Sequence, residues 1–431
     1  MILERGGGPL RPVELATVHA LTWLGVACGI GLLLAVLLLA PGLGRALGPL
    51  TYGRWMPLHL NLVLYGWTAL PLVALLFRSY LPREGSVAGR LAVAAVHVWS
   101  GTLAAGAVAW LAGEVTAKPF LDWQGGARAA FLLNLIFLAV VLAAGLAARA
   151  PRPSPSRLAG LGALWVGLLG VIAALALATS TSTYPPVNPD TGGPTGASLL
   201  GSTLGVIAIF AGTPLLLGLA PRVNRRTLGY AAAEAFGALA LHGLLFAAVA
   251  QGDHSHREPL QIGAVFSLLV WAWLLPRWLR RFAWPEGSRP WLLAFLAWGA
   301  ALLVTALPMF LPGLLDRIKF TNALVGHSHL AMAGMATSFV ALLLVVLNDR
   351  TRLRGVLGDR LAFGLWNAGN AVHVTVLALA GILEGADPGI VFRGDPSIAL
   401  LYGARALAGG ALLAAATRWL VKATRAVGEA S

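Results

Sequence analysis

The chain has 431 residues, of which 58% are apolar and only 11% are charged, and its mean hydropathy is +0.78. Soluble domains carry about 25% charged residues, so a soluble globule of this composition would lack the polar surface to cover itself. The single cysteine, Cys28, excludes a disulfide framework and any cysteine-rich zinc or iron–sulfur site. The composition indicates an integral membrane protein.

The apolar residues fall into about twelve runs of roughly the twenty residues that cross a bilayer. These runs predict an all-α integral membrane protein, organised as one domain over residues 1–431. The expected spans are 15–39, 55–78, 91–113, 129–148, 158–178, 198–219, 228–250, 260–279, 290–311, 320–347, 361–384 and 398–421. The eighth run is the weakest because Pro276 interrupts it.

The net charge of +14 comes from 31 Lys and Arg residues against 17 Asp and Glu residues. Most of the basic residues lie at the two ends of the chain and in every second loop, as with Arg78, Arg83 and Arg90 after the second run. Short cytoplasmic loops carry such an excess. The bias predicts an even number of spans with both termini cytoplasmic, and it attributes the positive charge to topology rather than to nucleic-acid binding.

Nine histidines are present, and an ionisable side chain inside a span is costly enough to be a functional candidate. They are His19, His59, His97, His242, His254, His256, His327, His329 and His373. A lone histidine is more often a neutral side chain bonded to a backbone carbonyl. His19, His97, His242 and His373 fall in that category.

Three histidines have a more informative position. His59 lies close to the outer end of the second run, and His327 and His329 form an H-x-H pair in the outer half of the tenth. Residues i and i+2 point about 200° apart around a helix, so the pair suits two sites on opposite faces. Neutral imidazole is the usual axial ligand of haem iron. The pattern favours two haems sharing one helix, and the alternative is a loose polar patch.

Four segments extend this interpretation to most of the chain. YGRWMPLHLNLVLYGW, FTNALVGHSHLAMAG, LALAGILEG and YGARALAGG resemble helices two, ten, eleven and twelve of the catalytic subunit (subunit I) of the haem–copper oxidase superfamily. The resemblance is to the cbb-type branch, which is close to the nitric oxide reductases. It implies a twelve-helix subunit I-like bundle in a bacterial or archaeal cytoplasmic membrane.

The resemblance also implies the cofactors. Two haems, expected to be b-type, would bind without covalent attachment. His59 and His329 would hold a low-spin haem, and His327 would be the catalytic, proximal ligand of a high-spin haem where O₂ or NO reacts. Arg405, about seven residues into the last span, is expected to neutralise a haem propionate or to snorkel to the interface. Arg393 in the preceding loop is a weaker candidate.

The pattern departs from the family at the second metal, which is copper B or a non-haem iron. Family members bind it with a histidine of helix six and a His-His pair after helix seven. Here the sixth run has Ser202 or a near neighbour at that place, and His254 and His256 are separated by one residue. His242 is a conceivable substitute, and the active-site tyrosine has no clear counterpart. We therefore expect copper or non-haem iron to be absent or substoichiometric.

Three functions remain open from the sequence. The first is a haem-binding respiratory oxidoreductase subunit, and the second is an electron-transfer or assembly relative that lacks the binuclear centre. The third is a twelve-span secondary transporter, although the two halves show none of the repeats that such proteins often have. Expected partners are membrane lipid, other respiratory subunits, and a cytochrome c, copper protein or quinol as electron donor. No nucleic-acid partner is expected.

Overall fold

The structure is a computed structural model that describes residues 11–82, 86–116, 118–149, 153–183, 185–186, 199–249, 258–311 and 313–429. Over these residues the fold is all-helical, and twelve helices are long and apolar enough to cross a membrane. The protein is an all-α, multi-pass membrane protein. The expected number of spans and the expected fold class are confirmed.

The twelve spans lie within about four residues of the expected ones, except that the last helix continues seven residues past the expected end at 421. In chain order they are α1 (Pro12–Leu39); α3 (Tyr52–Asn61), η1 (Leu62–Thr68) and α4 (Ala69–Tyr80); α5 (Val87–Ala112); α6 (Gly125–Ala147); α7 (Pro155–Ala178); α8 (Leu199–Leu217); α9 (Arg225–Val249); α10 (Pro259–Phe266), η2 (Ser267–Leu269) and α11 (Val270–Leu279); η3 (Glu286–Ser288) and α12 (Arg289–Met309); α14 (Asn322–His329), η4 (Leu330–Ala336) and α15 (Thr337–Leu347); α16 (Arg360–Ala386); and α17 (Pro396–Gly428). Three short elements lie between spans: α2 (Pro41–Ala46), α13 (Leu314–Ile318) and η5 (Val356–Gly358).

The eighth span is interrupted, but not at the predicted residue. Pro276 lies inside α11, whereas the change of helix type falls at Ser267–Leu269. The Ser267 hydroxyl donates a 2.6 Å hydrogen bond to the carbonyl of Ala264, three residues earlier. Serine side chains that bond to the backbone in this way compete with regular α-helix.

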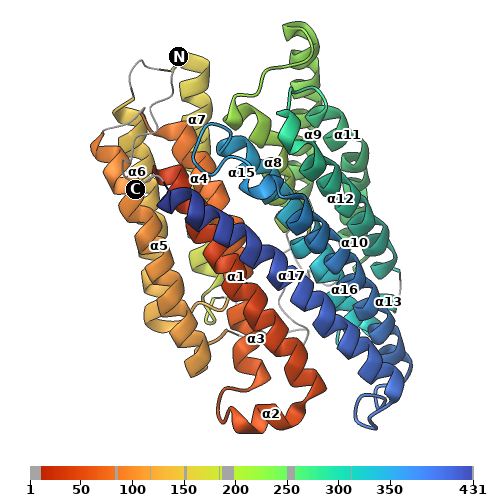
Figure 1. The fold of residues 1–431 in the computed structure, drawn as a ribbon. Coiled ribbons are helices and arrows are strands. Elements are labelled where there is room, and N and C mark those ends of the chain that lie inside the picture. Colours follow the sequence, from red (N-terminus) through yellow and green to blue (C-terminus); the bar gives the residue numbers. More distant parts are fainter. Residues whose placement is uncertain are drawn as a thin grey trace.

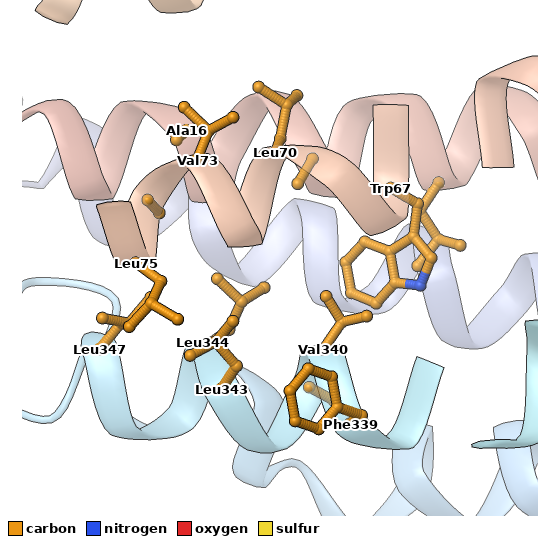
Figure 2. Packing of buried hydrophobic residues seen from close by; sticks show 14 of the residues in the cluster. Ala16, Trp67, Leu70, Val73, Leu75, Phe339, Val340, Leu343, Leu344 and Leu347 are labelled. Atoms are coloured by element: carbon orange, nitrogen blue, oxygen red, sulfur yellow. The ribbon is translucent and has the colours of Figure 1, made fainter. Parts of the chain in front are cut away.

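The helices that carry the candidate residues meet near the centre of the bundle. α17 runs diagonally along α1 and α16, and α16 in turn packs on α14 (Figure 1). Figure 2 shows α4 packed against α15: Leu75 points toward Leu347, whereas Leu70 and Val73 point toward α1. Every one of these side chains is at most 5% exposed, so truncating one to alanine would cost about 2–5 kcal/mol.

Asp359 links α16 to α17 through two ion pairs, at the end of the bundle that carries the basic loops. Asp359 caps α16 by accepting from the Ala362 amide at 2.8 Å, and it also accepts from Arg418 Nε at 2.9 Å. Lys422 pairs with its other oxygen. The Arg418 guanidinium is the main cause that holds the pKa of the Asp359 carboxyl well below its usual range.

We predict that Asp359→Ala destabilises the protein by about 1–3 kcal/mol, because it removes a helix cap and both ion pairs. The lowered pKa means that this stabilisation is present above about pH 4, the ordinary range of aspartate, and is lost as the pH falls further. Thermal unfolding in detergent at several pH values measures it. Asp349→Ala is the control, since the Asp349–Arg354 pair is exposed and should contribute almost nothing. Equal effects of the two substitutions would contradict the assignment.

Candidate functional site

Two imidazole rings lie close together in the interior of the bundle, with nearly parallel planes. The ring centroids of His59, near the end of α3, and His329, at the end of α14, are 6.5 Å apart, and their planes are inclined by 21°. His59 Nδ1 donates to the Ala27 carbonyl of α1 at 2.8 Å, and His329 Nδ1 donates to the Val325 carbonyl at 2.8 Å. A carbonyl partner places the proton on Nδ1. Each ring therefore keeps the lone pair of its Nε2 for a ligand.

His327 leaves α14 in another direction. Its Nδ1 lies 3.1 Å from the Thr305 hydroxyl of α12, away from the pair formed by His59 and His329. That hydroxyl is also 3.0 Å from the carbonyls of Ala301 and Leu302, to which it donates. It therefore accepts from Nδ1–H, and the Nε2 lone pair of His327 is available as well. As the i, i+2 spacing predicts, His327 and His329 point in different directions from α14.

Both helices change to a π-helix directly after the site. η1 begins three residues after His59, and η4 begins one residue after His329. π-helical segments are rare and frequently occur at functional sites. A threonine hydroxyl at or directly after the end of each segment donates to the carbonyl five residues earlier, from Thr68 to Val63 and from Thr337 to Met332. No periodicity argument from the sequence predicts these segments.

Indole groups satisfy the carbonyls that the wider turns release. Trp99 of α5 donates to the Tyr65 carbonyl in η1 at 2.9 Å, and Trp366 of α16 donates to the Ala333 carbonyl in η4 at 2.8 Å. Trp67 of η1 then donates to the Thr337 hydroxyl at 2.9 Å and joins the two spans. Unpaired backbone groups cost several kcal/mol in a bilayer, so the indoles fix both π-segments and, with them, the histidines.

Glycines allow the close approaches that this arrangement needs. A Cβ atom at Gly31 of α1 would lie 2.8 Å from His59 Cε1, so only glycine leaves room for that ring. In the π-segments, Cβ atoms at Gly66 and Gly334 would come within 3 Å of the side chains of Trp23 and Trp298. These contacts set how deeply the two histidine helices sit among their neighbours.

A buried polar network lies beside the imidazoles, between α14, α16 and α17. Asn322 donates to Glu384 through its backbone amide at 2.7 Å and through its side chain at 2.5 Å, and Tyr402 donates to Glu384 at 2.9 Å. Arg405 donates to the Asn322 side-chain oxygen at 3.0 Å. The network holds the guanidinium of Arg405, which is 6% exposed, at a fixed position within the apolar bundle.

Among the described residues, three hydrophilic side chains of α16 and α17 bury polar atoms for which no hydrogen bond of normal geometry is found. They are Asn370 and His373, which share one face of α16, and the Nε of Arg405. The His373 ring is 4.6 Å from the His329 ring. From the sequence we expected His373 to be a neutral histidine with only a structural role. Its i, i+3 relation to a second polar residue, Asn370, was the available signal. Buried polar groups normally find a partner, so this face is suited to a polar ligand group.

The other candidates lie apart from the imidazole pair. His242 of α9 is directed at η2, with Nδ1 2.8 Å from the Ala238 carbonyl and Nε2 3.3 Å from the Ser267 carbonyl. Arg393 is exposed in the loop before α17 and pairs with Asp387. Ser202 lies in α8, and His254 and His256 fall outside the described residues. Within the described residues, no group of three His, Cys, Asp or Glu side chains is arranged to hold a metal ion.

Comparison with known proteins finds a likeness in fold. The chain superposes on a haem–copper terminal oxidase, solved as a dimer by cryo-electron microscopy, with a TM-score of 0.54 and 14% sequence identity. The match covers 96% of this chain and 84% of that one. No protein-family model matches, and no curated protein matches. The expected subunit-I-like bundle is thus confirmed as a fold.

We predict that the polar network depends on Asn322 more than on Tyr402. Asn322→Ala removes one bond to Glu384 and the acceptor of Arg405, and should cost about 2 kcal/mol. Tyr402→Phe removes the bond to Glu384 and the longer, 3.2 Å bond that the hydroxyl accepts from Asn322, and should cost about 1 kcal/mol. Thermal unfolding of the purified variants ranks them. A larger loss from Tyr402→Phe would show that the network is organised around a different residue.

Proposed function

We propose that this chain is a haem-binding oxidoreductase subunit of a bacterial or archaeal respiratory complex, with both termini cytoplasmic. The observation that carries the proposal is the His59–His329 pair, whose ring centroids are 6.5 Å apart and whose Nδ1 atoms are both engaged by carbonyls. Metal–imidazole bonds are about 2 Å long. Two such bonds plus two half rings give about 6 Å between centroids, so one haem iron fits between them.

The remaining side chains fit the same group. The Ala27 and Val325 carbonyls orient the two ligand rings, which is the usual outer-shell role of a partner at Nδ1. The partnerless Nε of Arg405 and the ring of His373 offer donors for a propionate. A guanidinium forms strong charge-assisted bonds with a carboxylate. Arg393 is the weaker candidate for this role because it already pairs with Asp387.

His327 would hold a second, high-spin haem on the opposite side of α14. Thr305 accepts from its Nδ1 and orients the ring, so Nε2 would be the atom that holds the iron. The two haems, which we take to be b-type, supply one-electron chemistry and an iron that binds O₂ or NO. His59 and His329 hold the electron-transfer group in an apolar interior, and His327 is the residue next to the reaction.

Whether a second metal (copper or non-haem iron) binds near His327 decides between a gas-reducing subunit and one that lacks this reaction. α8 contains no histidine, and His242 is directed at η2 rather than toward His327. Three nitrogen ligands favour copper, and the described residues do not supply them near His327. We therefore propose electron transfer and gas binding at the haem, with His254 and His256 as weak candidates for a second metal. The alternative is a non-catalytic electron-transfer or assembly subunit.

We predict that replacing individual histidines removes individual haems. His59→Ala or His329→Ala should abolish the low-spin component of the reduced-minus-oxidised optical spectrum, because each loses one of two axial ligands. His327→Ala should remove only the high-spin component, together with carbon monoxide binding. His242→Ala is the control and should retain both spectra. A wild-type protein without haem after expression in a haem-replete host would contradict the proposal and favour a transporter.

We further predict that Gly31→Val impairs the low-spin haem, whereas Gly29→Val does not. A side chain at residue 31 displaces the His59 ring, while a Cβ at Gly29 meets no atom within 4 Å. Both positions lie in α1 and have the same change in helix propensity. The haem content per protein measures the effect. Equal losses in the two variants would show that α1 does not position His59.

A further inference from the structure

Two ionisable side chains are exposed well inside membrane-spanning helices, and neither belongs to the site described above. His97 is the eleventh residue of α5, and Glu234 is the tenth residue of α9. At about 1.5 Å of rise per residue, they lie about 14–15 Å from the start of their helices. Among the described residues, no other Asp, Glu or His away from the ends of a span is exposed. Such groups almost always face protein or water rather than lipid, so both side chains are expected to have a partner.

The two side chains cannot serve as partners within one copy of the chain. Among the described residues, Glu234 has no hydrogen bond or ion pair, and the polar contact of His97 is with the edge of the His19 ring. α5 packs mainly on α1, α3 and α6, whereas α9 packs mainly on α8, α10 and α11. α5 and α9 lie on opposite sides of the bundle (Figure 1). The exposed faces of both helices are therefore open to a second molecule.

The two exposed faces match in direction and in register. α5 and α9 are the third and seventh spans, so they cross the membrane in the same direction. An exposed glycine follows each ionisable residue by about one turn: Gly101 follows His97 by four residues, and Gly237 follows Glu234 by three. A Cβ atom at either glycine would meet no atom within 4 Å, so the packing of this chain does not require them. Small residues of this kind let two helices approach closely in a membrane.

We propose that copies of this chain associate in the membrane through α5 of one copy and α9 of the next, with the His97 imidazole hydrogen-bonded to the Glu234 carboxyl group. A second copy is the occupant that fits, because the basic and the acidic member of the pair lie on one chain at the same depth. The register that joins them also sets Gly101 against Gly237. The contact joins two different surfaces, so the assembly is a ring or a chain of copies rather than a two-fold dimer. It does not depend on haem.

The test is resonance energy transfer between full-length copies that carry donor or acceptor fluorescent proteins at the carboxyl end, in phosphatidylcholine vesicles. His97→Glu and Glu234→His should each weaken association about tenfold, as expected for the loss of one polar pair between membrane helices. The exchanged double variant His97→Glu/Glu234→His should restore association, because each contact again holds one residue of each kind. Gly237→Leu should also weaken it. Gly167→Leu in α7 is the matched control, since that glycine is likewise exposed and a Cβ there meets no atom within 4 Å.

Disulfide crosslinking in the same vesicles locates the contact. In a Cys28→Ala background, which removes the single native cysteine, copies with Gly101→Cys should crosslink to copies with Gly237→Cys on mild oxidation, whereas either variant alone should not. Crosslinks between like copies would overturn the proposal. So would a wild-type chain that stays monomeric at every lipid dilution, or a double exchange that associates as weakly as the single variants.

Discussion

The arrangement of the bundle follows from the need to hold two neutral imidazoles close together, with nearly parallel planes, in an apolar interior. His59 and His329 come from spans that are far apart in the sequence, and their rings lie 6.5 Å apart. A single helix, α1, contributes the Ala27 carbonyl that orients His59 and the glycine at residue 31 that leaves room for it. Each histidine sits just before a π-segment whose released carbonyl is bonded by an indole. Displacing any of these parts would move a ring.

In the described part of the chain, the region beside the imidazoles contains buried polar atoms without hydrogen bonds of normal geometry. In a bilayer a polar group cannot turn to water, so an unsatisfied one weakens the fold. Asn322, Glu384 and Tyr402 satisfy one another, whereas among the described residues Asn370, His373 and the Nε of Arg405 bury polar atoms without a hydrogen bond of normal geometry. A ligand that bonds these atoms would be stabilised by them and would stabilise the protein in return. The stability of the chain and its occupancy by haem are therefore expected to be coupled.

The spans and the H-x-H pair could be predicted from the sequence because hydrophobic runs and helical geometry are local properties. The twelve runs became twelve helices, and His327 and His329 leave α14 toward different neighbours. The π-segments could not be predicted, since they depend on tryptophans that come from other helices. His373 was undervalued for a similar reason: its importance arises from the packing of α16 on α14. The eighth span changes helix type at Ser267 rather than at Pro276. This position could not be predicted, because a hydrogen bond from a serine hydroxyl to the backbone leaves no trace in the hydrophobic pattern.

The central claim is that one iron sits between His59 and His329, and low-temperature electron paramagnetic resonance of the oxidised protein tests it most directly. Two axial imidazoles give a low-spin ferric haem, and planes inclined by only 21° predict a well-resolved rhombic signal. The expected result is this rhombic low-spin signal, with an intensity that corresponds to one haem per protein. A spectrum with no low-spin ferric component, or with one that is unchanged after His329→Ala, would contradict the account.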